Sequence, residues 1–235
     1  MSRNNHVVVI RFHFPENHPN FMWRFQYFAA VTLPAIRRQS FKDFDLAIWC
    51  NSWHENLFKS LDQSIITFGI NGYYLDYAKL KNFSKIVRGL HVDHVPWGAV
   101  RGLGKYEIQT AIDSDDLMID TFYLEKTREV LVGSGTAHVC FAPLIFDLAT
   151  LRTYTCRLQY STERGSAFYS LYQPEDRWGN YVFAYEDSHL RIGQMMDRRI
   201  FVSDNRYVAV TCHDKNDSTN LGIADKQIMP TTSFS

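Results

Sequence analysis

The chain has 235 residues, a mass of 27.4 kDa and 46% hydrophobic residues, so it can bury a substantial core. We expect one large domain in preference to two small ones. Lys+Arg and Asp+Glu each number 25, and the sequence pI is about 7.1. No overall charge therefore attracts the chain to nucleic acid or to an anionic membrane, and nucleic acid is excluded as an expected partner.

Cysteine spacing and hydropathy indicate the type of environment. The four cysteines lie far apart without a C-x-x-C motif, which predicts reduced, buried thiols. The first 14 residues lack the apolar core of a signal peptide, and no stretch reaches the roughly 18 apolar residues of a membrane span. We expect a soluble, cytoplasmic protein without a transmembrane segment.

The first elements alternate between strand and helix. The β-branched run at 6–14 predicts a buried parallel strand, and 44–51 predicts a second strand. Between them, residues 20–40 carry Phe21, Phe25, Phe28, Ala29 and Thr32 at helical spacing. Pro34 lies late in this helix, where it is expected to kink or restart it.

The next elements continue the alternation. The pattern is mixed from 55 to 90 and ends in an expected helix, followed by a loop rich in glycine and proline and then a strand. An amphipathic helix follows, capped by Asp120 and ended by Gly-Ser-Gly, and then a hairpin-like β segment. The expected bounds are 83–90 for the first helix, 91–106 for the loop, 107–112 for the strand, 121–132 for the amphipathic helix and 138–160 for the β segment. This order predicts an α/β fold with added β-structure in the C-terminal half.

The polar, turn-rich residues 214–235 predict an extended C-terminal arm or linker. Residues 1–213 are then the single folded domain.

Four aspartates follow the strand at 107–112 within eight positions, at 113, 115, 116 and 120. Carboxylates this close repel one another, so the cluster needs a ligand or plain solvent to relieve the charge. Asp113 and Asp115 are one residue apart, and in an extended stretch both can point to the same side. Their hard oxygens favour Mg²⁺ or Mn²⁺, with the diphosphate of a nucleotide donor as a further ligand. A solvated acidic surface is the alternative, and for an isolated D-x-D it is the commoner case.

Several segments in order resemble a known family. The run 32–51, "TLPAIRRQSFKDFDLAIWCN", is similar to the early segment of GT-A glycosyltransferases, and "AIDSDDLM" resembles their D-x-D element. With "IRFHF", "GSAFYSLYQP" and "VAVTCHDKN", the order over residues 7–216 resembles a family described as rhamnosyltransferases. The resemblance implies a GT-A-like central mixed sheet flanked by helices. Ala111 departs from the basic residue expected there, which leaves the donor phosphate contacts and the sugar open.

The resemblance also implies roles for the cluster and its neighbours. Asp113 would bind the ribose and share the metal, Asp115 would ligate the metal, and Asp116 would support them. His213 would be a late metal or pyrophosphate ligand, or else a surface histidine at the end of a strand. Arg11, at the carboxyl end of the first strand, would grip the base or phosphate, or else be an ordinary surface arginine.

Inverting transfer needs a carboxylate base on the acceptor side. Within 180–192, Glu186 and Asp187 follow a strand-like run, as in the E-D element of inverting GT-A enzymes. We predict Asp187 as the base and Glu186 as its neighbour or an acceptor contact. The pair could equally cap a helix, and Glu175 and Asp176 are substitutes.

The sequence therefore predicts a metal-dependent glycosyltransferase that moves rhamnose or another hexose or deoxyhexose from a nucleotide-diphosphate donor to a glycan hydroxyl. Two other classes remain open. One is a non-catalytic carbohydrate-binding module on the same fold, and the other is a metal-dependent phosphoesterase that uses the same aspartates.

Overall fold

The computed structural model describes residues 5–12, 18–70, 106–131, 133, 135–155, 168–174, 184, 192–212 and 227–228. Its centre is a seven-stranded sheet in the order β10-β6-β9-β4-β1-β2-β3. Strands β1, β2, β3 and β4 are mutually parallel, β9 runs antiparallel to both β4 and β6, and β10 is parallel to β6. The predicted mixed α/β sheet is thus confirmed. The strand bounds are β1 His6–Phe12, β2 Asp45–Asn51, β3 Ile66–Ile70, β4 Ile108–Asp113, β6 Ala137–Phe141, β9 Tyr169–Tyr172 and β10 Arg198–Val202.

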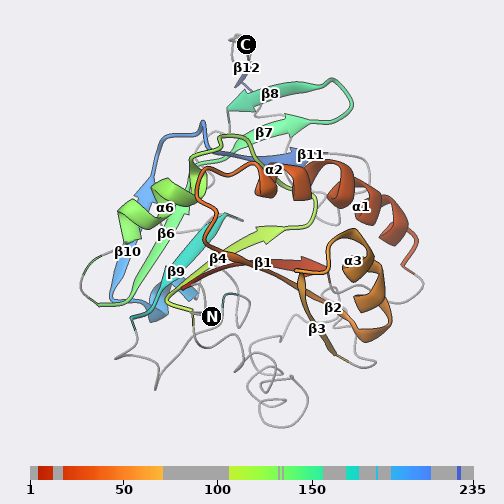
Figure 1. The fold of residues 1–235 in the computed structure, drawn as a ribbon. Helices are drawn as coiled ribbons and strands as arrows, with labels where there is room; N and C mark the ends of the chain where they lie inside the picture. Colours follow the sequence, from red (N-terminus) through yellow and green to blue (C-terminus); the bar gives the residue numbers. More distant parts are fainter. Residues whose placement is uncertain are drawn as a thin grey trace.

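A second sheet of five strands has the order β12-β8-β7-β11-β5. In Figure 1, β7, β8 and β11 lie together at the top of the molecule, beyond α1 and α2. The predicted hairpin is confirmed for β7 and β8, which pair antiparallel. The preceding strand β6 belongs to the other sheet, so the 138–160 segment is divided between the two sheets. The bounds are β5 Leu117–Met118, β7 Leu144–Asp147, β8 Arg152–Thr155, β11 Val208–Cys212 and β12 Gln227–Ile228.

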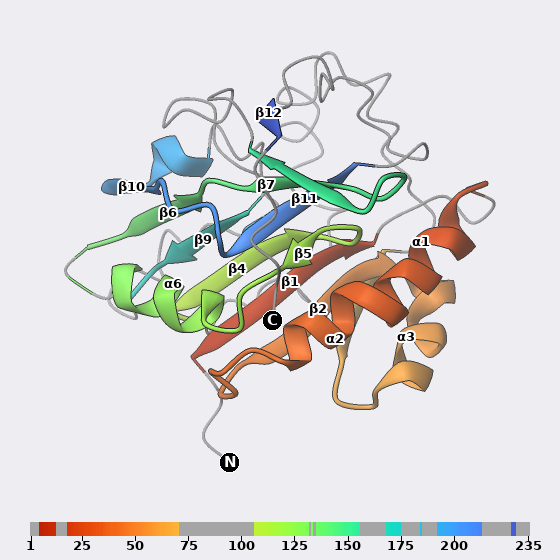
Figure 2. The same ribbon diagram turned by 90° about the horizontal axis from the view of Figure 1, so that it is seen from above.

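Helices cover one face of the large sheet, and Figure 2 shows α1, α2, α3 and α6 side by side along it. Alternate residues of β1 point to this face, and Val8, Ile10 and Phe12 are fully buried there. Edge-to-face contacts from Phe12 to three helical phenylalanines fill the layer, at ring-centroid distances of 5.0 to 5.7 Å. The helices are α1 Phe21–Tyr27, α2 Leu33–Arg37, α3 Glu55–Leu61 and α6 Tyr123–Leu131, with short helical turns at Ser52–His54 and Gly193–Met195.

The predicted break at Pro34 takes the form of a π-helix, η1, over Phe28–Thr32. Proline has no N–H and crowds the carbonyl one turn earlier, so a regular α-turn cannot continue through it. The chain widens instead, and the Leu33 N–H bonds to the Phe28 carbonyl five residues back. Helix α2 then starts with Pro34 in its first turn. Inserted π turns of this kind are frequent at functional sites.

Helix α6 begins with help from a distant side chain. The Asp120 carboxylate accepts a hydrogen bond from the Phe122 N–H at 2.7 Å, just before the helix. Inside the first turn, the Leu124 N–H donates to Oε1 of Gln39 at 3.1 Å. The predicted cap is therefore shared between Asp120 and Gln39, which follows α2.

Two of the expected thiols can be placed. Cys50 and Cys140 are buried thiols that are not in disulfides, as predicted. Along the described part of the chain, no helix combines the length and the apolar character needed to cross a bilayer.

His6, the first residue of β1, is a fully buried histidine. His6 shares a 2.8 Å hydrogen bond with Thr110 through Nε2, and Thr110 shares one of 2.7 Å with Ser170. Its Nδ1 has no hydrogen-bond partner among the described residues. Burial, reinforced by the Arg128 charge, lowers the pKa of His6 to about 3.

This histidine makes the fold sensitive to acid. In the unfolded chain His6 takes up a proton below pH 6.5, whereas the folded chain does so only near pH 3. Its contribution to stability is complete above pH 6.5 and is lost as pH falls below it. We expect His6 alone to lower the free energy of unfolding by about 2 kcal/mol from pH 6.5 to pH 5. Urea unfolding across this range should show a shallower pH slope for His6→Gln, and an unchanged slope would contradict the prediction.

Candidate active site

Two of the predicted site residues meet at the carboxyl ends of adjacent parallel strands. Arg11 of β1 and Asp113 of β4 are direct register partners. The Arg11 Nη2 lies 3.8 Å from the Asp113 Oδ1, and each side chain is about one-third exposed, at 34% and 35%. Arg11 and Asp113 lie two residues after the buried Val9 and Ala111 of their strands, so they share the face of these two residues, which is the sheet face opposite the helices. This loose, accessible pair is open to a ligand.

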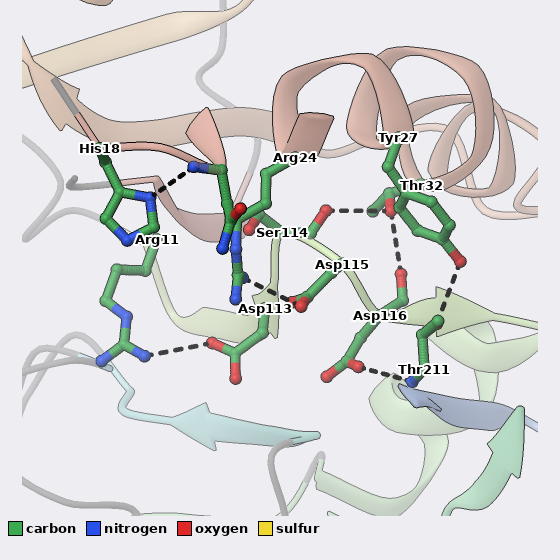
Figure 3. Close-up of polar contacts among 11 residues, drawn as sticks. Arg11, His18, Arg24, Tyr27, Thr32, Asp113, Ser114, Asp115, Asp116 and Thr211 are labelled. Atoms are coloured by element: carbon green, nitrogen blue, oxygen red, sulfur yellow. Dashed lines mark hydrogen bonds and ion pairs between the residues drawn. The ribbon is translucent and has the colours of Figure 1, made fainter. Parts of the chain in front are cut away.

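The backbone turns directly after Asp113. The Asp116 N–H bonds back to the Asp113 carbonyl at 3.2 Å, and β5 then begins at Leu117. The expectation that Asp113 and Asp115 lie in one extended stretch is therefore wrong. Because of this turn the two carboxylates have different surroundings, which Figure 3 shows as Asp113 directed to Arg11 and Asp115 directed to Arg24.

Asp115 is held in a buried ion pair. Nη1 of Arg24, on α1, donates to Oδ2 of Asp115 at 2.9 Å. The two side chains are only 7% and 11% exposed. Because the pair is so removed from water, losing either partner takes away a buried opposite charge that stabilises the other.

Asp116 is also buried, at 3% exposure, and points toward the second sheet. Its Oδ1 accepts a hydrogen bond from the Thr211 N–H of β11 at 3.0 Å. Burial, with the neighbouring charges of Asp115 and Asp113, raises the pKa of Asp116 well above its ordinary value. Nearby, the Tyr27 hydroxyl and the Thr211 hydroxyl share a 3.0 Å hydrogen bond. Burial raises the pKa of Tyr27 to about 12, so it stays protonated at neutral pH.

The π turn places a hydroxyl over the aspartate turn. Thr32, fully buried at the end of η1, donates from Oγ1 toward the carbonyls of Ser114 at 3.2 Å and Asp116 at 3.1 Å. These bonds attach the turn to the helix that also carries Arg24 (Figure 3). The break before Pro34 thus contributes directly to the geometry of the acidic segment.

The protein itself relieves much of the charge in this cluster. Arg24 pairs with Asp115, Asp116 accepts a backbone hydrogen bond while its raised pKa favours the uncharged acid, and Asp120 caps the start of α6. The expectation that only a ligand or solvent could relieve the aspartates is wrong for these three. Of the two D-x-D carboxylates, Asp113 is the accessible one, with Arg11 as a loose counter-ion.

A divalent cation fits this site in part. Asp113 offers an accessible carboxylate, and Asp115 offers a carboxylate whose Oδ2 is engaged by Arg24. The described residues contain no group of three or more His, Cys, Asp or Glu side chains that could hold a metal. Such a donor set is typical of a cation that takes its remaining ligands from a bound diphosphate and water.

Three of the predicted site residues, Glu186, Asp187 and His213, lie outside the described residues. The sequence did not predict three residues that shape the site: Arg24, Thr32 as a hydrogen-bond donor, and Thr211, whose backbone N–H bonds to Asp116. One signal was present. Arg24 lies on the apolar stripe of its helix between Phe21 and Phe25, and a charge on such a stripe needs a buried partner.

Comparisons with known proteins bear on the fold. No protein family and no curated protein matches the sequence. A mannosyltransferase from Pyrobaculum calidifontis, solved in complex with GDP-Man and Mn²⁺, superposes with a TM-score of 0.53 at 12% identity. The match covers 91% of this chain and 58% of the mannosyltransferase, so this chain spans little more than half of its length.

Two further structures are less similar. They are a 4-diphosphocytidyl-2C-methyl-D-erythritol synthase from Anaerococcus prevotii and a protein described as a nucleotide-diphospho-sugar transferase from Desulfovibrio desulfuricans. Their TM-scores are 0.42 and 0.40 at 10% and 9% identity. The matches cover 84% and 86% of this chain, and 86% and 83% of theirs. Of the three, the mannosyltransferase alone is similar enough to indicate a shared fold, and at 12% identity it indicates nothing beyond the fold. The chain has a GT-A-like fold, with a central mixed sheet flanked by helices, as the sequence predicts.

Proposed function

We propose that the chain is a nucleotide-sugar-dependent glycosyltransferase. The observation that carries the proposal is the accessible Arg11–Asp113 pair at the carboxyl ends of two parallel strands. Ligands of open α/β sheets bind outside these strand ends. A carboxylate beside a guanidinium suits a nucleoside diphosphate, because the first accepts hydroxyl hydrogen bonds and the second pairs with phosphate. The GT-A-like fold, shared with a mannosyltransferase that binds GDP-Man, supports the same class of donor.

The proposed reaction is a single displacement that inverts the anomeric centre. The acceptor hydroxyl oxygen bonds to the anomeric carbon while the bond from that carbon to the diphosphate oxygen breaks. A carboxylate takes the hydroxyl proton, and the nucleoside diphosphate leaves with the bonding electron pair. Asp187 is the proposed base and Glu186 its neighbour. Rhamnose, or another hexose or deoxyhexose, is the proposed sugar, and a glycan hydroxyl is the proposed acceptor.

Asp113 and Asp115, with His213 as a later ligand, would hold Mn²⁺ or Mg²⁺. When bound, such an ion supplies positive charge to the departing diphosphate. Asp113 would also accept a hydrogen bond from the ribose, and Arg11 would grip a phosphate or the base edge. Asp116 would support this set through its bond to the Thr211 N–H.

Hydrolysis of a panel of nucleotide sugars, with and without Mn²⁺, tests the function. Slow metal-dependent release of one nucleoside diphosphate, faster with a glycan acceptor, is the expected result. Release of inorganic phosphate from simple esters would instead indicate a phosphoesterase. Binding of glycans without turnover of any donor would indicate a carbohydrate-binding module.

Replacing the proposed base separates chemistry from binding. Asp187→Asn removes the proton acceptor but keeps the shape of the side chain, so transfer should be abolished while donor binding stays largely intact. Transfer assays and calorimetric titration of the donor measure the two effects, with Glu186→Gln as the neighbouring comparison. Transfer by Asp187→Asn at the normal rate would show that another group is the base.

A further inference from the structure

The two carboxylates of the D-x-D element differ in how they are held. Asp113 is one-third exposed and 3.8 Å from its arginine, whereas Asp115 is buried and 2.9 Å from its own. Arg24 reaches Asp115 from α1, 91 residues earlier in the chain. A divalent ion that used Asp115 fully would therefore compete with a buried guanidinium already in place.

The charge at the site leads to the same conclusion. Among the described residues, Arg11 and Arg24 offset the charges of Asp113 and Asp115, so these four side chains together carry no formal net charge. A divalent cation gains little electrostatic energy from a neutral donor set, and two nearby guanidinium groups repel it. A bound nucleoside diphosphate adds several negative charges and further oxygen ligands. Cation binding should then depend on the nucleotide.

We propose that Arg24 is a positioning residue that occupies Asp115 and makes divalent-ion binding conditional on the nucleoside diphosphate. The proposal rests on the proposed function, and it adds a residue that controls the order of binding. By linkage, the ion and the nucleotide raise each other's affinity for the protein by the same factor. The conditional step would keep the enzyme from holding a metal ion unless a donor is present.

The test measures binding of Mn²⁺ by electron paramagnetic resonance of the free ion. The full chain is titrated with Mn²⁺ alone, and then with Mn²⁺ plus UDP, GDP or dTDP, one at a time. Wild type should bind Mn²⁺ alone weakly. Its affinity for Mn²⁺ should rise by about tenfold or more when the nucleotide that fits the site is present. Arg24→Met should bind Mn²⁺ alone about tenfold more tightly than wild type, with a smaller gain from the nucleotide.

Three controls isolate the charge of Arg24. Arg24→Lys keeps the charge and should bind Mn²⁺ alone as weakly as wild type. Arg37→Met removes a 40% exposed arginine of α2 that pairs with Asp62, and it should change nothing. Arg24→Met combined with Asp115→Asn should lose the gained affinity. If Arg24→Met does not fold by circular dichroism, Arg24→Gln, which keeps N–H donors without the charge, supports the same comparison.

Binding of Mn²⁺ alone that is no tighter in the uncharged Arg24 variants than in wild type would overturn the proposal. That result is distinguishable from failure of the proposed function. If the proposed function fails, wild type turns over no nucleotide sugar. The affinities of Arg24→Met and Arg24→Lys for Mn²⁺ alone can still be compared, because that measurement needs no turnover.

Discussion

Asparagine in place of Asp113 is expected to lower sugar transfer by about 10²- to 10³-fold, because it removes a charged ligand of the ion that would stabilise the departing diphosphate. The variant keeps the shape of the side chain but loses the accessible negative charge opposite Arg11. The side chain is 35% exposed, so the free energy of unfolding should change by no more than about 0.5 kcal/mol. Initial rates with the preferred donor and a urea titration measure the two quantities.

A matched control is available in the loop before β11. Asp204 is 39% exposed on its side chain and lies 2.8 Å from the Nε of Arg206, so it forms a surface Asp–Arg pair like that of Asp113. Asp204→Asn should leave transfer within about twofold of wild type, because surface pairs of this kind contribute little. If the two variants lose the same transfer activity, or if Asp113→Asn loses none, Asp113 has no role in the reaction.

The local parts of the fold could be predicted from the sequence. The β-branched run of β1, the apolar run of β2 and the apolar spacing of α1 are signals within a few residues, and the structure confirms the three elements. Pro34 predicted a kink or restart but not a π turn. The form of the break depends on Thr32 bonding to carbonyls more than 80 residues away, and periodicity contains no such information.

The pairing within the site could not be predicted for a similar reason. The charged Arg24 on an apolar stripe calls for a partner, but only the fold brings α1 over the turn after β4. The turn itself is fixed by bonds to η1 and β11. As a result, the aspartates of one short motif have three different environments: an accessible pair, a buried ion pair and a buried amide contact.

Breaking the buried ion pair is expected to be the costliest polar change in this region. Arg24→Met removes the guanidinium that pairs with the buried Asp115 carboxylate, and Asp115→Leu removes the carboxylate that pairs with Arg24. Each variant should lower the free energy of unfolding by about 3–5 kcal/mol. Urea unfolding at neutral pH without added metal measures the loss, so this result does not depend on any ligand.

The double variant decides whether the loss belongs to the pair. Arg24→Met with Asp115→Leu replaces both charges by apolar groups of similar size, and such exchanges are often neutral. Its loss should be clearly smaller than the sum of the two single losses, which gives a coupling energy of at least about 2 kcal/mol in the cycle. Additive losses would mean that each side chain acts through packing alone. The charge of Arg24 would then not stabilise Asp115, and Arg24 could not make metal binding depend on the nucleotide.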